Sequence, residues 1–173
     1  LLANYLGWDF IDAADVVRFD KQGVFAAEWT NRVLTEELKK HERAVIPGFY
    51  GAFPDGSVRT FSRGGSDISG ALVARAAGAE LYENWTDVSG FLMADPRVVQ
   101  NPAGIERLTY RELRELSYMG ATVLHEDAIF PVHKAGIPTN IRNTNDPDHP
   151  GTMIVDKAQD VRYRYPITGI AGH

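Results

Sequence analysis

Residues 60–67, which read TFSRGGSD, place an arginine, two glycines, a serine and an aspartate next to one another. Gly64 and Gly65 lack a Cβ atom, so the backbone N–H groups there can come close to a ligand. A helix that begins here would attract an anion to its N-terminus. The Arg63 guanidinium can hold a carboxylate or a phosphate through two parallel hydrogen bonds. The segment therefore predicts an anion site, with Ser66 and Asp67 beside it.

Three further segments concentrate polar residues. Residues 85–97 (WTDVSGFLMADPR) carry Thr86, Asp87 and Arg97, residues 119–127 join two predicted helices, and residues 143–152 form a long polar loop. Arginines, glycine N–H groups and helix ends neutralise phosphate charge. Phosphoryl transfer depends mainly on positioning and electrostatic stabilisation of the moving group. This set of residues favours phosphoryl transfer over nucleophilic hydrolysis.

The motifs of several other enzyme classes are missing from the sequence. It has no G-x-S-x-G, no cysteine and no metal-ligand spacing among its five histidines, so we predict no protein-held metal site. Neither G-x-x-x-x-G-K-[ST] nor G-x-G-x-x-G occurs. A kinase with this sequence is therefore neither a P-loop enzyme nor a protein kinase.

Each segment taken alone also has a simple structural interpretation. The RGGSD stretch can be a glycine turn followed by a capping aspartate, which is common at helix starts. The TDVSG stretch can be a turn at the end of a strand, and His125 can be a packing residue. The functional interpretation depends on the segments occurring together and in this order.

The surrounding elements predict an α/β fold. Helices are expected at 1–7, 26–41, 108–121 and 126–136, and directly after residue 65 with Ser66 or Asp67 as N-cap. Thr109 and Glu112 form a predicted capping box. Strands are expected at 137–144 and 151–155, a strand or a strand plus loop at 10–19, and strands that lead into loops at 44–53 and 80–90, with a turn at Asp55–Gly56. Alternating strands and helices predict a mainly parallel sheet, whose ligands bind at the carboxyl ends of its strands.

Composition excludes several classes of protein. The 173 residues carry 18 Lys and Arg against 23 Asp and Glu, a net charge of −5, which argues against nucleic-acid binding. We recognise no signal peptide in these residues and no apolar run long enough to cross a bilayer. We therefore expect a cytoplasmic protein with no membrane partner. Because the sequence starts with LLANYLGW and stops at ITGIAGH, both ends read as internal, and we expect a piece of a longer protein.

Together, four stretches resemble the aspartate kinases of the amino acid kinase family. They are residues 45–67, 84–99, 108–132 and 137–152, in the family's order. The resemblance implies a three-layer αβα sandwich of the carbamate kinase-like type, here incomplete. It assigns residues 1–165 to the C-terminal part of a kinase domain and residues 166–173 to the start of a truncated regulatory ACT domain.

The resemblance also implies an activity: ATP-dependent, Mg²⁺-dependent phosphorylation of the L-aspartate side chain to 4-phospho-L-aspartate. This is the first step toward lysine, threonine and methionine. A homo-oligomer is expected. By this resemblance, Asp67 is catalytic because it organises the lysines around the transferring group. The implied substrate residues are Arg63, Gly64, Gly65 and Ser66, and the implied nucleotide residues are Thr86, Asp87 and Arg97.

The sequence departs from the family pattern at three places. Thr122 and Leu92 stand where many members have lysine and tyrosine, with Lys134 and Arg142 as basic residues that could compensate. The family's lysine-glycine-glycine phosphate motif and its acidic substrate residue are missing. We therefore predict little or no activity for these 173 residues alone. The alternatives are a non-catalytic nucleotide- or amino-acid-binding module and, less favoured, a kinase for another acid.

Overall fold

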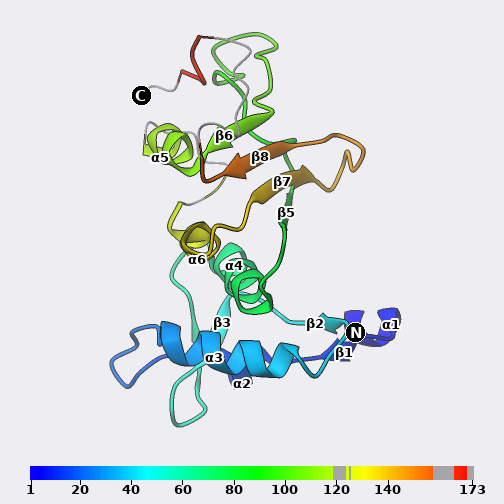
Figure 1. Cartoon of the computed structure of the whole chain (residues 1–173), viewed down its shortest axis with the longest axis vertical. Helices are drawn as coiled ribbons and strands as arrows, with labels where there is room; N and C mark the ends of the chain where they lie inside the picture. Colours follow the sequence, from blue (N-terminus) through cyan, green and yellow to red (C-terminus); the bar gives the residue numbers. More distant parts are fainter. Residues whose placement is uncertain (119–123, 125, 158–165, 171–173) are drawn as a thin grey trace. The chain divides into compact units, whose positions relative to one another are not determined.

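A computed structural model describes residues 1–118, 124, 126–157 and 166–170. Its internal contacts divide the chain into two compact units, Leu1–Ala79 and Glu80–His173. Each unit has its own helices and strands, most of which are labelled in Figure 1. The positions of Thr122 and His125, discussed above, lie outside the described residues.

The first unit contains four helices and four short strands among its described residues. In chain order they are α1 (Leu2–Leu6), β1 (Asp9–Phe10), α2 (Ala13–Val16), α3 (Ala27–Leu38), β2 (Ala44–Val45), β3 (Tyr50–Ala52), β4 (Val58–Thr60) and α4 (Gly65–Ala77). Strand β1 pairs in parallel with β2, and β3 pairs antiparallel with β4. The predicted Asp55–Gly56 turn closes this second pair, with Gly56 at φ 85°.

The core of the first unit lies between α2, α3 and α4. Leu34 of α3 and Ala71 of α4 are fully buried, and Leu72 of α4 is almost so. The small residues of α4, among them Ala71, allow it to pack closely against α3. Four phenylalanine rings (Phe19, Phe25, Phe53 and Phe61) pack edge to face or tilted, with centroids 5.1–6.5 Å apart.

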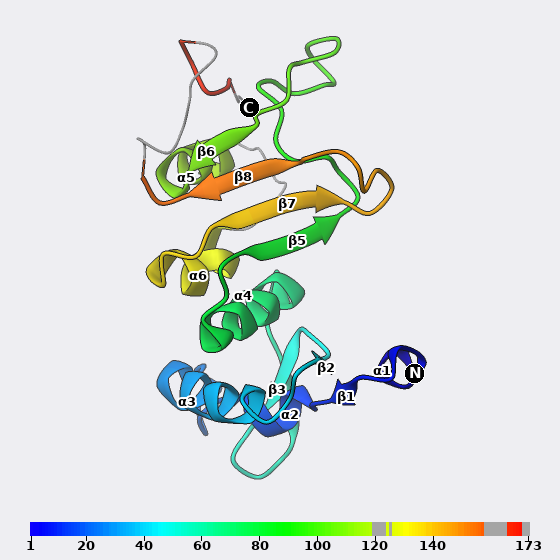
Figure 2. The same cartoon turned by 45° about the vertical axis from the view of Figure 1, so that its right-hand side comes forward.

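The second unit is built on one four-stranded sheet. Its elements are β5 (Tyr82–Thr86), β6 (Arg107–Thr109), α5 (Tyr110–Tyr118), the 3₁₀ helix η1 (Glu126–Ile129), α6 (Phe130–Lys134), β7 (Thr139–Asn143) and β8 (Thr152–Val155). The strand order is β5-β7-β8-β6. β5 runs parallel to β7 and β6 parallel to β8, while β7 and β8 are antiparallel (Figure 2).

This topology brings two loops to the same edge of the sheet. Strands β5 and β7 end at the edge where β6 and β8 begin. The β5–β6 loop (residues 87–106) and the β7–β8 loop (residues 144–151) therefore both lie there, as Figure 2 shows. The strand ends that carry Thr86 and Asn143 are thus placed side by side.

Local contacts explain how α5 is fixed to this sheet. The predicted capping box is present: the Thr109 backbone N–H donates to a Glu112 carboxylate oxygen (2.8 Å), and the Glu112 N–H donates to the Thr109 hydroxyl (3.2 Å). The buried Tyr110 hydroxyl donates to the carbonyl of Ile137 (2.8 Å), just before β7. Burial raises the pKa of Tyr110 to about 12.

The α/β class with mostly parallel pairing is confirmed. The helices predicted at 1–7 and 26–41 are present with shorter bounds, and the helix predicted at 108–121 is present over its described residues from Tyr110 onward. The strand predicted at 10–19 is wrong in its middle, because Asp12 caps the short helix α2 by accepting the N–H of Ala14 (2.9 Å). The helix predicted at 126–136 starts as the 3₁₀ turn η1. No helix of the described residues is long and apolar enough to cross a membrane.

Candidate functional site

Helix α4 begins without a side-chain cap. Gly64 is the N-cap, with φ 57° and ψ 25°, and no side chain accepts a hydrogen bond there. The prediction of Ser66 or Asp67 as N-cap is therefore wrong. Gly64 adopts the left-handed conformation that glycine tolerates best, and the helix starts two or three residues earlier than predicted. Ser66 and Asp67 thus lie within the first helical turn.

Phe49 lies so close to Gly65 that only glycine fits at this position. A Cβ atom at this position would lie 2.9 Å from both Cα and Cβ of Phe49. Phe49 itself has φ 66°, a strained conformation for a bulky residue. The RGGSD glycines therefore have a structural role: one allows the turn, and the other lets residues 48–49 lie against the start of α4.

Ser69 holds these two segments together. Its hydroxyl accepts the N–H of Phe49 (3.0 Å) and donates to the carbonyl of Gly65 (2.8 Å). Ser69 is buried, with 6% of its surface exposed. Sequence reasoning missed this residue. The signal for it was small: a serine one helical turn after a glycine pair.

The polar side chains at this helix start differ in exposure. Arg63 and Ser66 are exposed, and Asp67 is half-buried in the first turn of α4. The first N–H groups of a helix carry partial positive charge, which the acidic Asp67 complements. The groups near this helix start that can bind an anion are these N–H groups, the Ser66 hydroxyl and the Arg63 guanidinium. We call residues 63–67 the α4 start site.

In the second unit, the end of β5 is held by the β7–β8 loop. The Thr86 carbonyl accepts both the N–H (2.8 Å) and the hydroxyl (3.0 Å) of Thr144. The Thr86 hydroxyl donates to the Asp87 carboxylate (3.3 Å). Asn143 donates its side-chain amide to the Ser89 hydroxyl (2.8 Å). Sequence reasoning missed Asn143 and Thr144, which position the predicted pair Thr86 and Asp87.

The β5–β6 loop is anchored through the buried hydroxyl of Thr152. This hydroxyl accepts the N–H of Phe91 (2.8 Å) and donates to the carbonyl of Ile105 (2.6 Å). Gly90, at φ 95°, passes so close that a Cβ atom would lie 2.2 Å from the same hydroxyl oxygen. The loop base is thus fixed to β8 on both of its arms.

Arg97 lies farther along this loop and pairs with Asp95. The Arg97 guanidinium reaches the Asp95 carboxylate at 2.6 Å, and the Arg97 N–H donates to it at 2.8 Å. These hydrogen bonds hold the pKa of Asp95 below its usual range. The Arg97 side chain is 87% exposed. It can therefore turn toward a phosphate at small cost, because exposed ion pairs are weak.

Of the two basic residues considered as replacements for a lysine at position 122, Arg142 is engaged elsewhere. Its guanidinium lies over the Trp85 ring (4.9 Å to the centroid). It also donates to the carbonyl of Pro147 (2.6 Å) and to Glu83 (3.3 Å). Lys134 lies in the last turn of α6.

The predicted site residues thus fall into two groups. The α4 start site belongs to the first unit, and Thr86, Asp87 and Arg97 belong to the second. Within the second unit, the structure brings Thr86 and Asp87 together with Asn143 and Thr144. No group of three or more His, Cys, Asp or Glu side chains in the described part of the chain is arranged to hold a metal ion.

The family can now be assigned from comparison with known proteins. Residues 12–143 match the model of the amino acid kinase family. The chain belongs to the amino acid kinase family. Aspartokinase 3 of Bacillus subtilis is 49% identical over 127 residues, which cover 73% of this chain and 28% of that protein.

Two solved structures of the family share the fold. Aspartate kinase of Clostridium acetobutylicum superposes with a TM-score of 0.91 at 56% identity, covering 98% of this chain and 39% of that one. Escherichia coli aspartokinase III, solved with aspartate and ADP, has a TM-score of 0.76 at 29% identity, covering 87% and 35%. The chain therefore spans well under half the length of these relatives. The amino acid kinase fold predicted from sequence, incomplete here, is confirmed.

Proposed function

We propose that the protein containing this chain is an aspartate kinase. A side-chain carboxylate oxygen of L-aspartate attacks the γ-phosphorus of ATP, and the bond from that phosphorus to the bridging oxygen of ADP breaks. The products are 4-phospho-L-aspartate and ADP. The observation that carries the proposal is the start of α4, where no side chain caps the first helical turn and the neighbouring Arg63 is exposed. The similarity to aspartokinases supports it.

The α4 start site binds the amino acid in this proposal. The planar guanidinium of Arg63 pairs with the α-carboxylate through two hydrogen bonds. Ser66 adds its hydroxyl, and the N–H groups of Gly64 and Gly65 line the same turn. Asp67 is the catalytic acidic residue, which orients positive groups around the transferring phosphoryl. The E. coli structure solved with aspartate and ADP supports this choice of substrates.

Thr86, Asp87 and Arg97 bind the nucleotide in this proposal. Arg97 exchanges Asp95 for a phosphate, while Thr144 keeps the end of β5 in place. Mg²⁺ usually binds through substrate phosphates and one or two carboxylates rather than a protein cage. The described residues fit this arrangement, with Asp87 as the nearby carboxylate. The ion neutralises phosphate charge when bound.

Further parts of the proposal concern the whole protein. Residues 1–165 form part of its kinase domain, and residues 166–173 begin a regulatory ACT domain. The protein works in the cytoplasm as a homo-oligomer, and its product leads to lysine, threonine and methionine. The 173 residues alone turn over little or no substrate, because the family's lysine-glycine-glycine motif is missing from them.

The test is a coupled assay of ADP release by the full-length protein. We expect Arg63→Ala to raise KM for aspartate by roughly 10- to 100-fold, because charge-assisted hydrogen bonds are lost. Arg97→Ala should raise KM for ATP instead. Asp67→Asn should lower kcat by about 100-fold or more. Arg111→Ala, an exposed arginine of α5, is the matched control. An equal rise in KM for aspartate in Arg63→Ala and Arg111→Ala would contradict the role assigned to Arg63.

A non-catalytic binding module is the second candidate, and the missing lysine motif favours it for these 173 residues taken alone. Calorimetric titration with Mg-ATP, with and without saturating L-aspartate, separates the two when it is combined with the assay. Binding of both ligands by the full-length protein without ADP release would support the module. The same titration of the 173-residue chain shows whether its loops bind nucleotide without the rest of the protein.

A further inference from the structure

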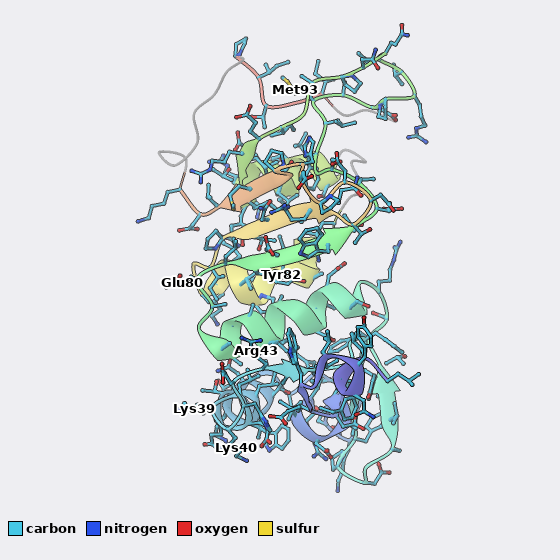
Figure 3. All side chains as sticks on the ribbon, turned by 90° about the vertical axis from the view of Figure 1, so that its right-hand side faces the viewer. Lys39, Lys40, Arg43, Glu80, Tyr82 and Met93 are labelled. Carbon is cyan, nitrogen blue, oxygen red and sulfur yellow. The ribbon has the colours of Figure 1, made fainter. Side chains whose placement is uncertain are left out.

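The segment 166–170 is tied to the loop that carries Arg97. The N–H of Ile170 donates to the carbonyl of Met93 at 2.7 Å. The hydroxyl of Thr168 donates to a carboxylate oxygen of Glu112, in the first turn of α5, at 2.5 Å. Figure 3 shows Met93 where the β5–β6 loop passes beside this segment. We call residues 167–170 the strap.

Gly169 fits closely between these two contacts. A Cβ atom at this position would lie 3.2 Å from the Met93 carbonyl oxygen and 3.2 Å from the Leu116 side chain of α5. The strap therefore packs closely against both the β5–β6 loop and α5. Glu112 is a firm attachment point, because its other carboxylate oxygen closes the capping box on Thr109. The strap thus joins the loop to an ordered helix start.

The loop needs such a support at this point. Its base is anchored at Phe91 and Ile105 through Thr152, and Met93 is the next paired residue, donating its N–H to the carbonyl of Ala103 (2.9 Å). Beyond Met93, the N–H groups of Val98 and Val99 donate to the Asp95 carbonyl, and Arg97 pairs with the Asp95 side chain. These contacts stay within residues 95–99 and do not join them to the sheet. The strap fixes the Met93 carbonyl two residues before Asp95.

We propose that Thr168 and the Ile170 N–H are positioning groups that hold the β5–β6 loop in the conformation that presents Arg97 to the nucleotide. They act through Met93 and touch no substrate. The proposal rests on the nucleotide role proposed above for this loop. Because the strap holds the loop before nucleotide binds, it lowers the free-energy cost of ordering the loop on binding. Losing one hydrogen bond of the strap should weaken binding by about fivefold.

The test uses the full-length protein and two matched pairs of variants. Thr168→Val removes the hydroxyl, whereas Thr168→Ser keeps it. Ile170→Pro removes the N–H donor, whereas Ile170→Ala keeps it and changes only an exposed side chain. Hydrogen exchange of the amides of residues 91–99 is measured without ligand. KM for ATP, KM for aspartate and kcat are then measured for each variant.

We expect faster exchange and an about fivefold higher KM for ATP in Thr168→Val and Ile170→Pro, with KM for aspartate unchanged. Thr168→Ser and Ile170→Ala should match wild type in both readouts. Equal exchange within each pair would overturn the proposal, since the strap would not hold the loop. Faster exchange with unchanged KM for ATP would also overturn it. Failure of the wild-type protein to bind nucleotide is measured separately and would reject the proposed function itself.

Discussion

Ser69 and Phe49 are joined by a hydrogen bond that closes the start of α4 against the preceding loop. The Phe49 N–H donates to the Ser69 hydroxyl at 3.0 Å, although the two residues are 20 positions apart. The same hydroxyl donates to Gly65. One side chain thus holds Phe49 in its strained left-handed conformation beside the predicted substrate residues. The α4 start site depends on this residue for its shape.

Ser69→Ala should destabilise the first unit. The change leaves the Phe49 N–H and the Gly65 carbonyl without this partner in a partly buried place, at a cost of about 1–3 kcal/mol. Denaturant unfolding measures the loss. Ser62→Ala is the control, because Ser62 is exposed, and its effect should stay within about 0.5 kcal/mol. Equal midpoints for the two variants would contradict the role given to Ser69.

Gly65→Ala should be harmful even though alanine favours helices. The added methyl group would lie 2.9 Å from Phe49 main-chain and side-chain atoms and 3.1 Å from Cβ of Phe61. Overpacking of this kind costs about 1–3 kcal/mol. The free energy of unfolding measures it. Gly104→Ala is the matched control, since a Cβ atom there meets nothing within 4 Å. A stabilised Gly65→Ala protein would show that the loop has room.

Thr152→Val should loosen the β5–β6 loop. Valine has nearly the shape of threonine, but it leaves the Phe91 N–H and the Ile105 carbonyl without their buried partner. The cost is about 1–3 kcal/mol for each buried group left without a partner. Thermal unfolding and proteolysis within the loop measure the change. Thr60→Val, at an exposed position of β4, serves as control. Protection of the loop equal to wild type would contradict the anchoring role.

His41 should titrate above its ordinary range. Its ring nitrogens contact the carboxylates of Asp9 (2.7 Å) and Glu37 (3.3 Å), and these hydrogen bonds raise the pKa of His41, with Asp9 as the larger cause. Glu37, which also pairs with Lys40, has a lowered pKa. Because the folded pKa of His41 is raised, its stabilisation is fully present below about pH 6.5, its ordinary pKa. This stabilisation is lost as the pH rises through the folded value.

NMR titration of the His41 ring measures this pKa directly. Asp9→Asn should lower it toward the ordinary histidine value, because the larger cause of the shift is removed. The difference in free energy of unfolding between wild type and His41→Gln should be largest at the acid end of a series from about pH 5 to about pH 8.5. This range brackets the ordinary pKa of histidine. A difference that grows with increasing pH would have the wrong sign and would contradict the pairing.

Local sequence signals predicted the elements whose contacts are local. The capping box between Thr109 and Glu112 spans three residues and is present. The Asp55–Gly56 turn and the helical spacing of apolar residues in α3 are also signals that span only a few residues. The cap of α4 was misassigned because side-chain propensity favoured Ser66 or Asp67. The close approach of Phe49 instead set the chain path through Gly64 and Gly65.

The sequence by itself determined the α/β class, the order of the loops and the family resemblance carried by SRGGSD and TDVSG. The tertiary structure decided which groups position those loops. Hydrogen bonds join Thr144 to Thr86, Thr152 to Phe91 and Thr168 to Glu112. The two partners are 58, 61 and 56 positions apart in the sequence, respectively. Such contacts depend on the strand order β5-β7-β8-β6 and its antiparallel pair. Hydrophobic periodicity reports which face of an element is buried, but it does not report which distant segment covers that face.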